Sequence, residues 1–188
     1  MVAVALSLSS TIIAGSDCPG AHINMTMEAA CREATTAGKP LPMYKLCKRM
    51  LVQRTPAGSF HEASEYASIA AEEVWLLYSF VMYYMRSALV NSSIPGEANA
   101  AYELCIHDYQ EADATMDRTR RKLDRVLKGL SECCGLNLSN EYRAALHSVG
   151  ACRDRLAKLS NSPLLDNNED IYNRTMVAYM LGKLIGIM

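Results

Sequence analysis

The chain has 188 residues, half of them apolar, and a formal net charge of −1 at pH 7. This length suits one domain with a sizeable buried core, and the apolar content excludes a disordered chain. The near-neutral charge argues against a nucleic-acid-binding surface or an acidic tail. We expect a single folded domain at 17–188, preceded by a signal peptide at 1–16.

Residues 1–16 have part of the pattern of a secretory signal peptide. A short apolar run is followed by Ala14-Gly-Ser16, which resembles a cleavage site of small residues, but the usual basic start is missing. We expect a signal peptide here; a disordered start or a truncated gene model is the alternative. The longest strongly apolar run after it, Val74–Met85, is about half the ~20 residues that a membrane span needs. The sequence therefore predicts a secreted, soluble protein.

The next segment, at about 25–54, predicts an N-terminal helical hairpin. Two short helical stretches are separated by the sequence TTAGKPLP, in which glycine and proline favour a turn. Cys31 and Cys47 flank this turn, and a bond between them would hold together a unit too short to be stable alone. Free buried thiols are the alternative.

Two long segments with helical periodicity follow, at 61–89 and 101–130. The expected inward positions of the first are Tyr66, Ala70, Val74, Leu77, Val81, Tyr84 and Ala88. Those of the second are Tyr102, Cys105, Tyr109, Ala112, Met116, Thr119, Leu123, Val126 and Leu130. Because the second set alternates steps of three and four without a slip, we expect one long amphipathic helix there.

Two further helices complete the expected fold, at 140–160 and 170–188. The inward positions of the first are Tyr142, Ala145, Val149, Cys152, Leu156 and Leu159. Gly129 is expected just past a helix end, and Ser139 and Asn167 are expected to cap the last two helices. No segment shows sustained strand alternation. The sequence predicts an all-α fold, an antiparallel up-down-up-down four-helix bundle at about 61–188 with the N-terminal helical hairpin beside it.

The cysteines and sequons indicate an oxidising compartment. Seven cysteines occur, at positions 18, 31, 47, 105, 133, 134 and 152, which is many for a cytosolic protein of this size. None forms a Cys-x-x-Cys motif, so a disulfide framework with one thiol left over is the preferred interpretation. Candidate glycosylation sites at Asn24, Asn91, Asn137 and Asn173 agree with secretion.

The stretch AYELCIHDYQEADATM (101–116) contains a cysteine, a histidine and several acids, so a catalytic interpretation has to be considered. On a helix, His107 lies about 200° from Cys105 and Asp108 lies at the flank, so the three side chains do not converge. His61-Glu-Ala-Ser-Glu65 lacks the second histidine of a zinc-protease motif. We expect no catalytic residue, no metal site and no cofactor.

Cys105 and Cys152 both lie on the inward stripes of neighbouring helices. Each could therefore face the other across the seam between these helices. A bond there would close a loop of about 48 residues and stabilise the fold by about 4 kcal/mol. Two free buried thiols are again the alternative.

Three cysteine-containing segments follow a known arrangement. They are Cys31…Cys47-Lys-Arg-Met-Leu51, Ala101-Tyr-Glu-Leu-Cys105-Ile-His-Asp-Tyr109-Gln-Glu-Ala112-x3-Met116 and Arg143-Ala-Ala-Leu146-x5-Cys152-Arg-Asp154. They resemble the Cys…Cys-x3-Leu, Cys-x3-Tyr-x2-Ala-x3-Leu and Ser-Ala-Ala-Leu-x5-Cys-x-Asp segments of the plant invertase and pectin methylesterase inhibitors. The resemblance implies disulfides Cys31–Cys47 and Cys105–Cys152, a location in the apoplast or cell wall, and reversible inhibition without a catalytic group.

The chain also departs from that family. The interval between Cys31 and Cys47 is several residues longer than usual, Cys133 and Cys134 lie in an enlarged loop, and Cys18 is extra. The Pro-Lys-Phe segment known from the invertase inhibitors does not occur. This favours pectin methylesterase over acid invertase as the protein target, although a fold alone does not settle the target.

Inhibition by such a bundle would consist of covering the target's substrate cleft with a rigid helical face. Outward positions of the helix at 101–130 are the candidate target-binding residues: Glu103, His107, Gln110, Asp113 and Asp117. A non-inhibitory structural or allergen-like protein of the same fold is the further alternative. We expect no nucleic-acid or membrane partner.

The connection at 128–139, between the second and third bundle helices, is expected to be irregular. If Cys105 faces Cys152, the two helices extend unequally beyond the bond, by roughly 15 Å along the axis. We therefore expect an irregular segment that runs back along the bundle, with Gly129 and Gly135 permitting its bends. It would bring Cys133 or Cys134 towards Cys18.

Overall fold

The computed structural model describes residues 20–36, 40–56, 58–90, 96–129, 137–159 and 162–186. Their elements in chain order are β1 (Asn24–Thr26), α1 (Met27–Ala34), α2 (Pro40–Leu51), β2 (Phe60–Glu62), α3 (Ala63–Val90), α4 (Gly96–Leu127), α5 (Leu138–Leu156) and α6 (Leu165–Leu184). The described chain is thus almost entirely helical, as the sequence predicts.

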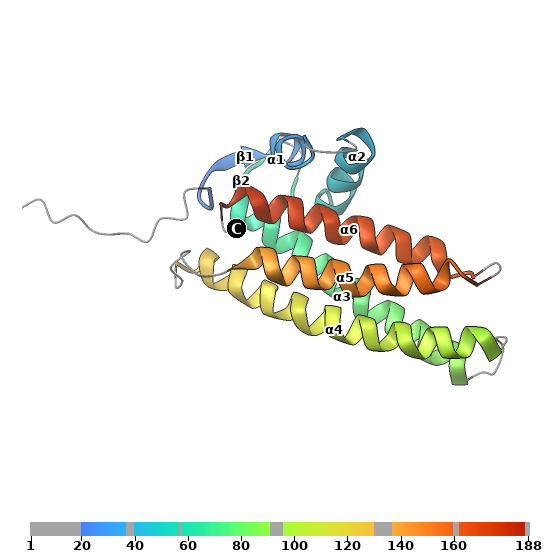
Figure 1. Ribbon diagram of the computed structural model, residues 1–188. Coiled ribbons are helices and arrows are strands. Elements are labelled where there is room, and N and C mark those ends of the chain that lie inside the picture. Colours follow the sequence, from blue (N-terminus) through green and yellow to red (C-terminus); the bar gives the residue numbers. More distant parts are fainter. Residues whose placement is uncertain are drawn as a thin grey trace, which may run out of the picture.

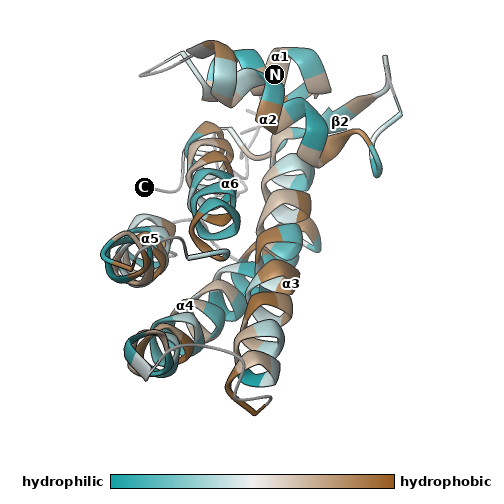
Figure 2. Cartoon of the chain, turned by 90° about the vertical axis from the view of Figure 1, so that its right-hand side faces the viewer, coloured by the Kyte–Doolittle hydropathy of each residue, from teal (hydrophilic) through white to brown (hydrophobic). Residues whose placement is uncertain are grey.

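Helices α3 to α6 form a four-helix bundle in which successive helices run in opposite directions (Figure 1). Each packs against two neighbours: α3 contacts α4 and α6, and so does α5. In the end-on view of Figure 2, α3 and α5 lie on opposite sides of the bundle. This is the up-down-up-down arrangement that the helical periodicity predicts.

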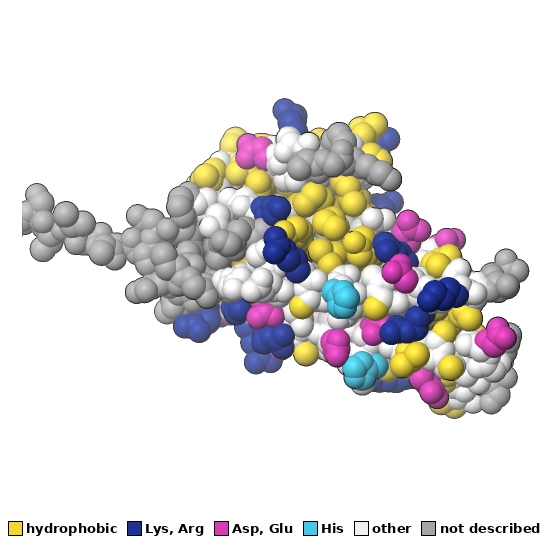
Figure 3. Space-filling view, in the orientation of Figure 1, with side chains coloured by type: hydrophobic (Ala, Val, Ile, Leu, Met, Phe, Trp, Pro, Cys, Tyr) yellow, Lys and Arg dark blue, Asp and Glu magenta, His cyan; other side chains and the backbone are white. Residues whose placement is uncertain are grey.

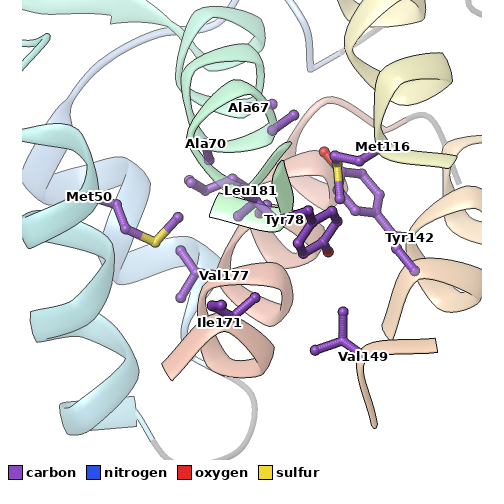
Figure 4. Close-up of a cluster of buried hydrophobic side chains, with 14 of the residues drawn as sticks. Met50, Ala67, Ala70, Tyr78, Met116, Tyr142, Val149, Ile171, Val177 and Leu181 are labelled. Carbon is purple, nitrogen blue, oxygen red and sulfur yellow. The ribbon is translucent and has the colours of Figure 1, made fainter. Parts of the chain in front are cut away.

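The buried face of α4 is the one that the spacing of three and four predicts. Eight of the nine predicted positions, from Tyr102 to Val126, are buried, and Leu130 lies outside the described residues. In α5 the predicted positions from Tyr142 to Leu156 are buried as well. Figure 4 shows how side chains of α2, α3, α4, α5 and α6 meet in one apolar cluster.

The orientation of α3 was predicted less well. Tyr84 was expected inside but is 48% exposed, whereas Tyr78 and Met85 are fully buried. The hydroxyl of Tyr78 lies 2.8 Å from Oγ1 of Thr175 on α6, which satisfies this polar group inside the core. Residues 74–85 are apolar on all sides, so their periodicity does not indicate which side faces inward.

The predicted hairpin of α1 and α2 lies across α6 at one edge of the bundle (Figures 1 and 2). The Cys31–Cys47 disulfide joins its helices, with the two Cα atoms 5.6 Å apart. Strands β1 and β2 were not predicted; they pair antiparallel with Met25 opposite His61. Because these strands directly precede α1 and α3, their pairing fixes the start of the hairpin beside the start of α3. Strands of three residues are too short to show alternation.

Several helix ends differ from the prediction. Gly129 does lie just past α4, with a φ of 64° that favours glycine. The predicted caps Ser139 and Asn167 are wrong, because both lie inside the first turn of their helices. The cap positions are Asn137 and Leu164, and neither side chain makes a capping hydrogen bond. Helix α6 also begins five residues before the predicted start at 170.

Helices α4 and α5 extend unequally from the bond between Cys105 and Cys152. Helix α4 continues for 22 residues beyond Cys105, whereas α5 begins 14 residues before Cys152. Helix α4 therefore projects about 12 Å further at this end, which is visible in Figure 1. The connection at 130–136 with Cys133 and Cys134 lies outside the described residues, as does Cys18, so their path and pairing stay predictions.

Candidate functional site

The seam between α4 and α5 is closed by a disulfide. Cys105 and Cys152 are both fully buried, and their Cα atoms lie 4.7 Å apart. These are the two residues that the family resemblance pairs. His107 lies on the opposite, exposed side of α4, and Asp108 is buried beside Arg155. The cysteine, histidine and aspartate of the opening stretch therefore do not converge on one point.

Ion pairs also join α4 and α5, beside the disulfide and near the start of α5. Glu141 of α5 accepts a hydrogen bond from Nε of Arg118 at 3.2 Å and another from Nζ of Lys122 at 3.1 Å, both on α4. Burial alone would raise the pKa of Glu141, but these two cations outweigh it and lower the pKa below its ordinary value. Beside the disulfide, Arg155 donates to the carboxylate of Asp108. The two helices are thus joined from the disulfide to the first turn of α5.

Three of the five predicted target-binding residues lie on the exposed side of α4. Glu103, His107 and Gln110 are exposed, and His107 pairs with Glu111 at 3.9 Å. Leu104, Glu111 and Arg118 share this side and were missed, although their helical spacing from His107 would have indicated them. We call the set Glu103, Leu104, His107, Gln110, Glu111 and Arg118 the α4 outer face.

The other two predicted residues are less free to meet a partner. Asp113 turns towards α3, where Oγ of Ser79 lies 3.4 Å from its Oδ1. Burial raises the pKa of Asp113, and the nearby charge of Asp117 adds to the increase. Burial also acts on Asp117, but hydrogen bonds from Arg120 and Arg121 lower its pKa. Both aspartates therefore already have partners within the bundle.

Figure 3 shows charged side chains of both signs over α4 and α5, whereas hydrophobic side chains gather where α6 meets the hairpin. Among the described residues, no group of histidine, cysteine and acidic side chains could hold a metal ion. None of the described helices is both long and apolar enough to cross a membrane. The polar surface over α4 and α5 is therefore chemically suited to hydrogen bonding with another macromolecule.

The candidate glycosylation sites differ in accessibility. Asn24 in β1 and Asn137 before α5 are exposed. Asn173 lies half-buried inside α6, and the threonine of its sequon, Thr175, is fully buried and bonded to Tyr78. Asn91 lies outside the described residues.

No known family model matches the sequence, and no curated protein sequence does. Two solved structures of Arabidopsis proteins match the fold. A mutant form of a pectin methylesterase inhibitor has a TM-score of 0.62 and 16% identity over 84% of this chain and 95% of that one. A second structure of an Arabidopsis thaliana pectin methylesterase inhibitor has a TM-score of 0.55 at the same identity and covers 93% of that chain. This chain has the pectin methylesterase inhibitor fold.

The match covers 84% of this chain, so it extends beyond the four-helix bundle alone. At 16% identity, the surface side chains of this chain have to be considered on their own. Within the fold, the α4 outer face combines exposure, polar groups and support by a disulfide. It is the exposed polar surface on which most of the predicted target-binding residues lie.

Proposed function

We propose that this chain is a secreted inhibitor of pectin methylesterase that covers the enzyme's substrate cleft by reversible complex formation. The observation that carries the proposal is the match to two pectin methylesterase inhibitor structures. The disulfide across the seam of α4 and α5 adds support. The proposal involves no catalytic step.

The physical basis of inhibition is the rigidity of the α4 outer face. A surface that is already ordered loses little conformational entropy on binding, so more of its contact energy becomes affinity. Helix α4 is tied to α5 by the Cys105–Cys152 disulfide and by the ion pairs of Glu141. A rigid helix of this kind excludes the polymeric substrate by filling its path.

The chemistry of the α4 outer face suits a cleft that binds sugars. Glu103 and Glu111 supply acceptors, Arg118 supplies donors, and Leu104 adds an apolar side chain that is 53% exposed. A sugar-binding cleft presents hydrogen-bonding groups that these side chains satisfy while they exclude water. The complex would then be held mainly by a few well-packed residues near its centre.

The decisive experiment is an activity assay with the purified full-length chain. Pectin methylesterase is titrated with the chain and the release of acid from pectin is followed; acid invertase is assayed in parallel. We expect the esterase to slow in a saturable, reversible manner. Slowing of acid invertase alone would make that enzyme the target, and no effect on either enzyme would favour a non-inhibitory protein of this fold.

Paired charge reversals test the binding face. Glu103→Lys should raise the inhibition constant by about tenfold or more, since it reverses an exposed charge of the α4 outer face. Glu169→Lys makes the same change on the exposed surface of α6 and should leave inhibition unchanged. Equal inhibition by both variants would place the contact elsewhere on the bundle.

Secretion is part of the proposal. Both disulfides, Cys31–Cys47 and Cys105–Cys152, form stably only in an oxidising compartment. Mass mapping of peptides from non-reduced protein should find both pairs linked. Recovery of all four cysteines as alkylatable thiols in folded protein would contradict this location.

A further inference from the structure

The outer face of α3 is apolar although it is exposed. Leu76, Phe80, Tyr83 and Tyr84 are 49%, 67%, 71% and 48% exposed. We call these four residues the α3 outer face. No charged residue occurs between Glu73 and Arg86, and Figure 2 shows α3 at an edge of the bundle. Soluble monomers seldom expose a contiguous apolar patch of this kind, so such a patch indicates an interaction surface.

A groove runs beside this face, between α3 and α6. Its volume is about 330 Å³, and its lining includes Leu77, Phe80, Tyr84, Leu164 and Ile171. A groove of this size with mainly apolar walls accepts an aromatic side chain from a second molecule. The α3 outer face therefore has exposed aromatic side chains next to a groove that could accommodate an aromatic side chain of a second molecule.

The charges that flank this face are arranged symmetrically about Ser79. Glu72 lies seven residues before Ser79 and Arg86 lies seven residues after it. Arg86 is fourteen positions after Glu72, and at about 100° per position the two side chains point within about 40° of each other around the helix axis. Both charges therefore lie on the same flank of α3. Leu76 and Tyr83 lie three residues before and four residues after the same midpoint. When two copies of α3 are placed antiparallel about Ser79, the negative end of one helix lies opposite the positive end of the other, and the apolar residues lie opposite each other.

A twofold axis perpendicular to α3 places equal flanks of two antiparallel helices against each other. Glu72 of each subunit then faces Arg86 of the partner subunit, which gives two ion pairs. Within one subunit, Glu72 bonds only Arg54 among the described residues, and no described carboxylate pairs with the exposed Arg86. Arg86 is therefore available for a contact between copies, whereas Glu72 would share its carboxylate between Arg54 and the partner subunit.

We propose that the α3 outer face is the interface with a second copy of this chain, paired antiparallel about a twofold axis near Ser79. Phe80 lies next to the axis, and Leu76 and Tyr83 pack across it. An unrelated protein or a membrane surface would cover the apolar rings equally well. Only a second copy supplies the opposite charge at both ends of the face by symmetry.

The proposed dimer leaves the α4 outer face open, because that face lies on a different helix. Each subunit of the dimer could then bind one target molecule. The inference goes beyond inhibition and does not depend on it. Failure of the dimer leaves the inhibition assay unaffected, and failure of inhibition leaves the dimer unaffected.

Sedimentation velocity of the full-length chain over a dilution series tests the proposal. We expect a concentration-dependent monomer–dimer equilibrium that weakens at high salt, because the Glu72–Arg86 pairs lie at the exposed rim. Phe80→Gln should weaken association by at least about tenfold, since it removes an apolar ring from the centre of the contact. Leu104→Gln, a matched change at an exposed apolar residue of α4, should not weaken it.

Charge exchange tests the register. Glu72→Arg and Arg86→Glu should each dissociate the dimer, because each places like charges opposite one another. An equimolar mixture of the two variants restores two opposite-charge pairs and should associate again. Arg86→Glu leaves the Glu72–Arg54 bond intact, so its effect cannot be attributed to loss of that bond.

Several outcomes would overturn the proposal. A wild-type chain that stays monomeric at all concentrations would do so, and so would a mixture of charge variants that fails to associate. Binding of the wild-type monomer to phosphatidylcholine vesicles, lost in Phe80→Gln, would assign the face to a lipid surface. Loss of esterase inhibition by monomeric Phe80→Gln would assign it to the target enzyme.

Discussion

Helices α3 and α4 pack against each other and bury similar inner faces, yet their outer faces are opposite in character. Helix α3 has 4 charged residues among 28, whereas α4 has 12 among 32. The core constrains only the inward positions, so the outward positions of two adjacent helices can serve different purposes. The charged face of α4 suits a hydrogen-bonded contact with a target, and the apolar face of α3 suits a contact between copies.

The largest effect is expected from opening the seam that supports α4. Replacing both Cys105 and Cys152 with serine should lower the free energy of unfolding by about 4 kcal/mol, because the bond closes a long loop. We expect inhibition to weaken as well, while association through α3 is retained. Urea unfolding, the esterase assay and sedimentation of the same variant measure these three quantities.

The hairpin disulfide is the matched control for this prediction. Replacing Cys31 and Cys47 with serine opens a loop with a sequence separation of 16 rather than 47, and should cost about 3 kcal/mol. A larger loss of stability from the hairpin variant would contradict the central role of the α4–α5 seam.

Truncation of buried side chains sharpens the contrast between inner and outer faces. Leu123→Ala in α4 and Met85→Ala in α3 should each cost about 3 kcal/mol, because both side chains are fully buried. The exposed counterparts Leu104→Ala and Tyr83→Ala should change stability by at most about 0.5 kcal/mol. Urea unfolding at low protein concentration checks this. A large loss from either exposed residue would mean that its outer face belongs to the core.

A smaller effect is expected from Glu141, which pairs with two cations of α4. Its pKa is lowered in the folded state, so its stabilising contribution is complete above the unfolded pKa of about 4.3. The contribution is lost as the pH falls through the folded pKa. Glu141→Gln should therefore cost about 1 kcal/mol at neutral pH and almost nothing in acid. A cost that does not change with pH would show that packing rather than charge is responsible.

The smallest effect is expected from Asp113, which lies where α4 meets α3. Its pKa is raised by burial, so the folded state holds its proton more tightly than the unfolded chain does. Stability should decline slightly as the pH rises from the unfolded pKa through the folded pKa. Asp113→Asn should lack this decline. Thermal unfolding of both proteins over a pH series measures it, and parallel curves would contradict the expectation.

Much of the fold could be predicted because the pattern of α4 is unambiguous. Charged residues alternate there with apolar ones, so only one side of the helix can face the core. The same reasoning failed in part for α3, where Tyr84 was placed inside and the buried Tyr78 was not among the predicted inward positions. An apolar run without charges satisfies every orientation equally, and only packing against α4 and α6 selects one.

The candidate site could be predicted only in part for a related reason. Helical geometry places Glu103, His107 and Gln110 outward, but it does not reveal which outward residues find partners across the bundle. Asp108 was expected at a flank and is instead buried beside Arg155, 47 positions away in the sequence. Asp113 has a partner on α3. Such distant pairs follow from the three-dimensional arrangement of the helices and leave no local pattern.

Any glycan on Asn173 would have to be attached before α6 folds, because this residue is half-buried in the folded helix. Its sequon requires Thr175, which the folded protein keeps inside the core against Tyr78. An enzyme that attaches a glycan must therefore reach this segment while it is still an unfolded chain. The fraction of molecules glycosylated at Asn173, compared with the fraction at the exposed Asn24, would therefore measure how long α6 stays unfolded after synthesis.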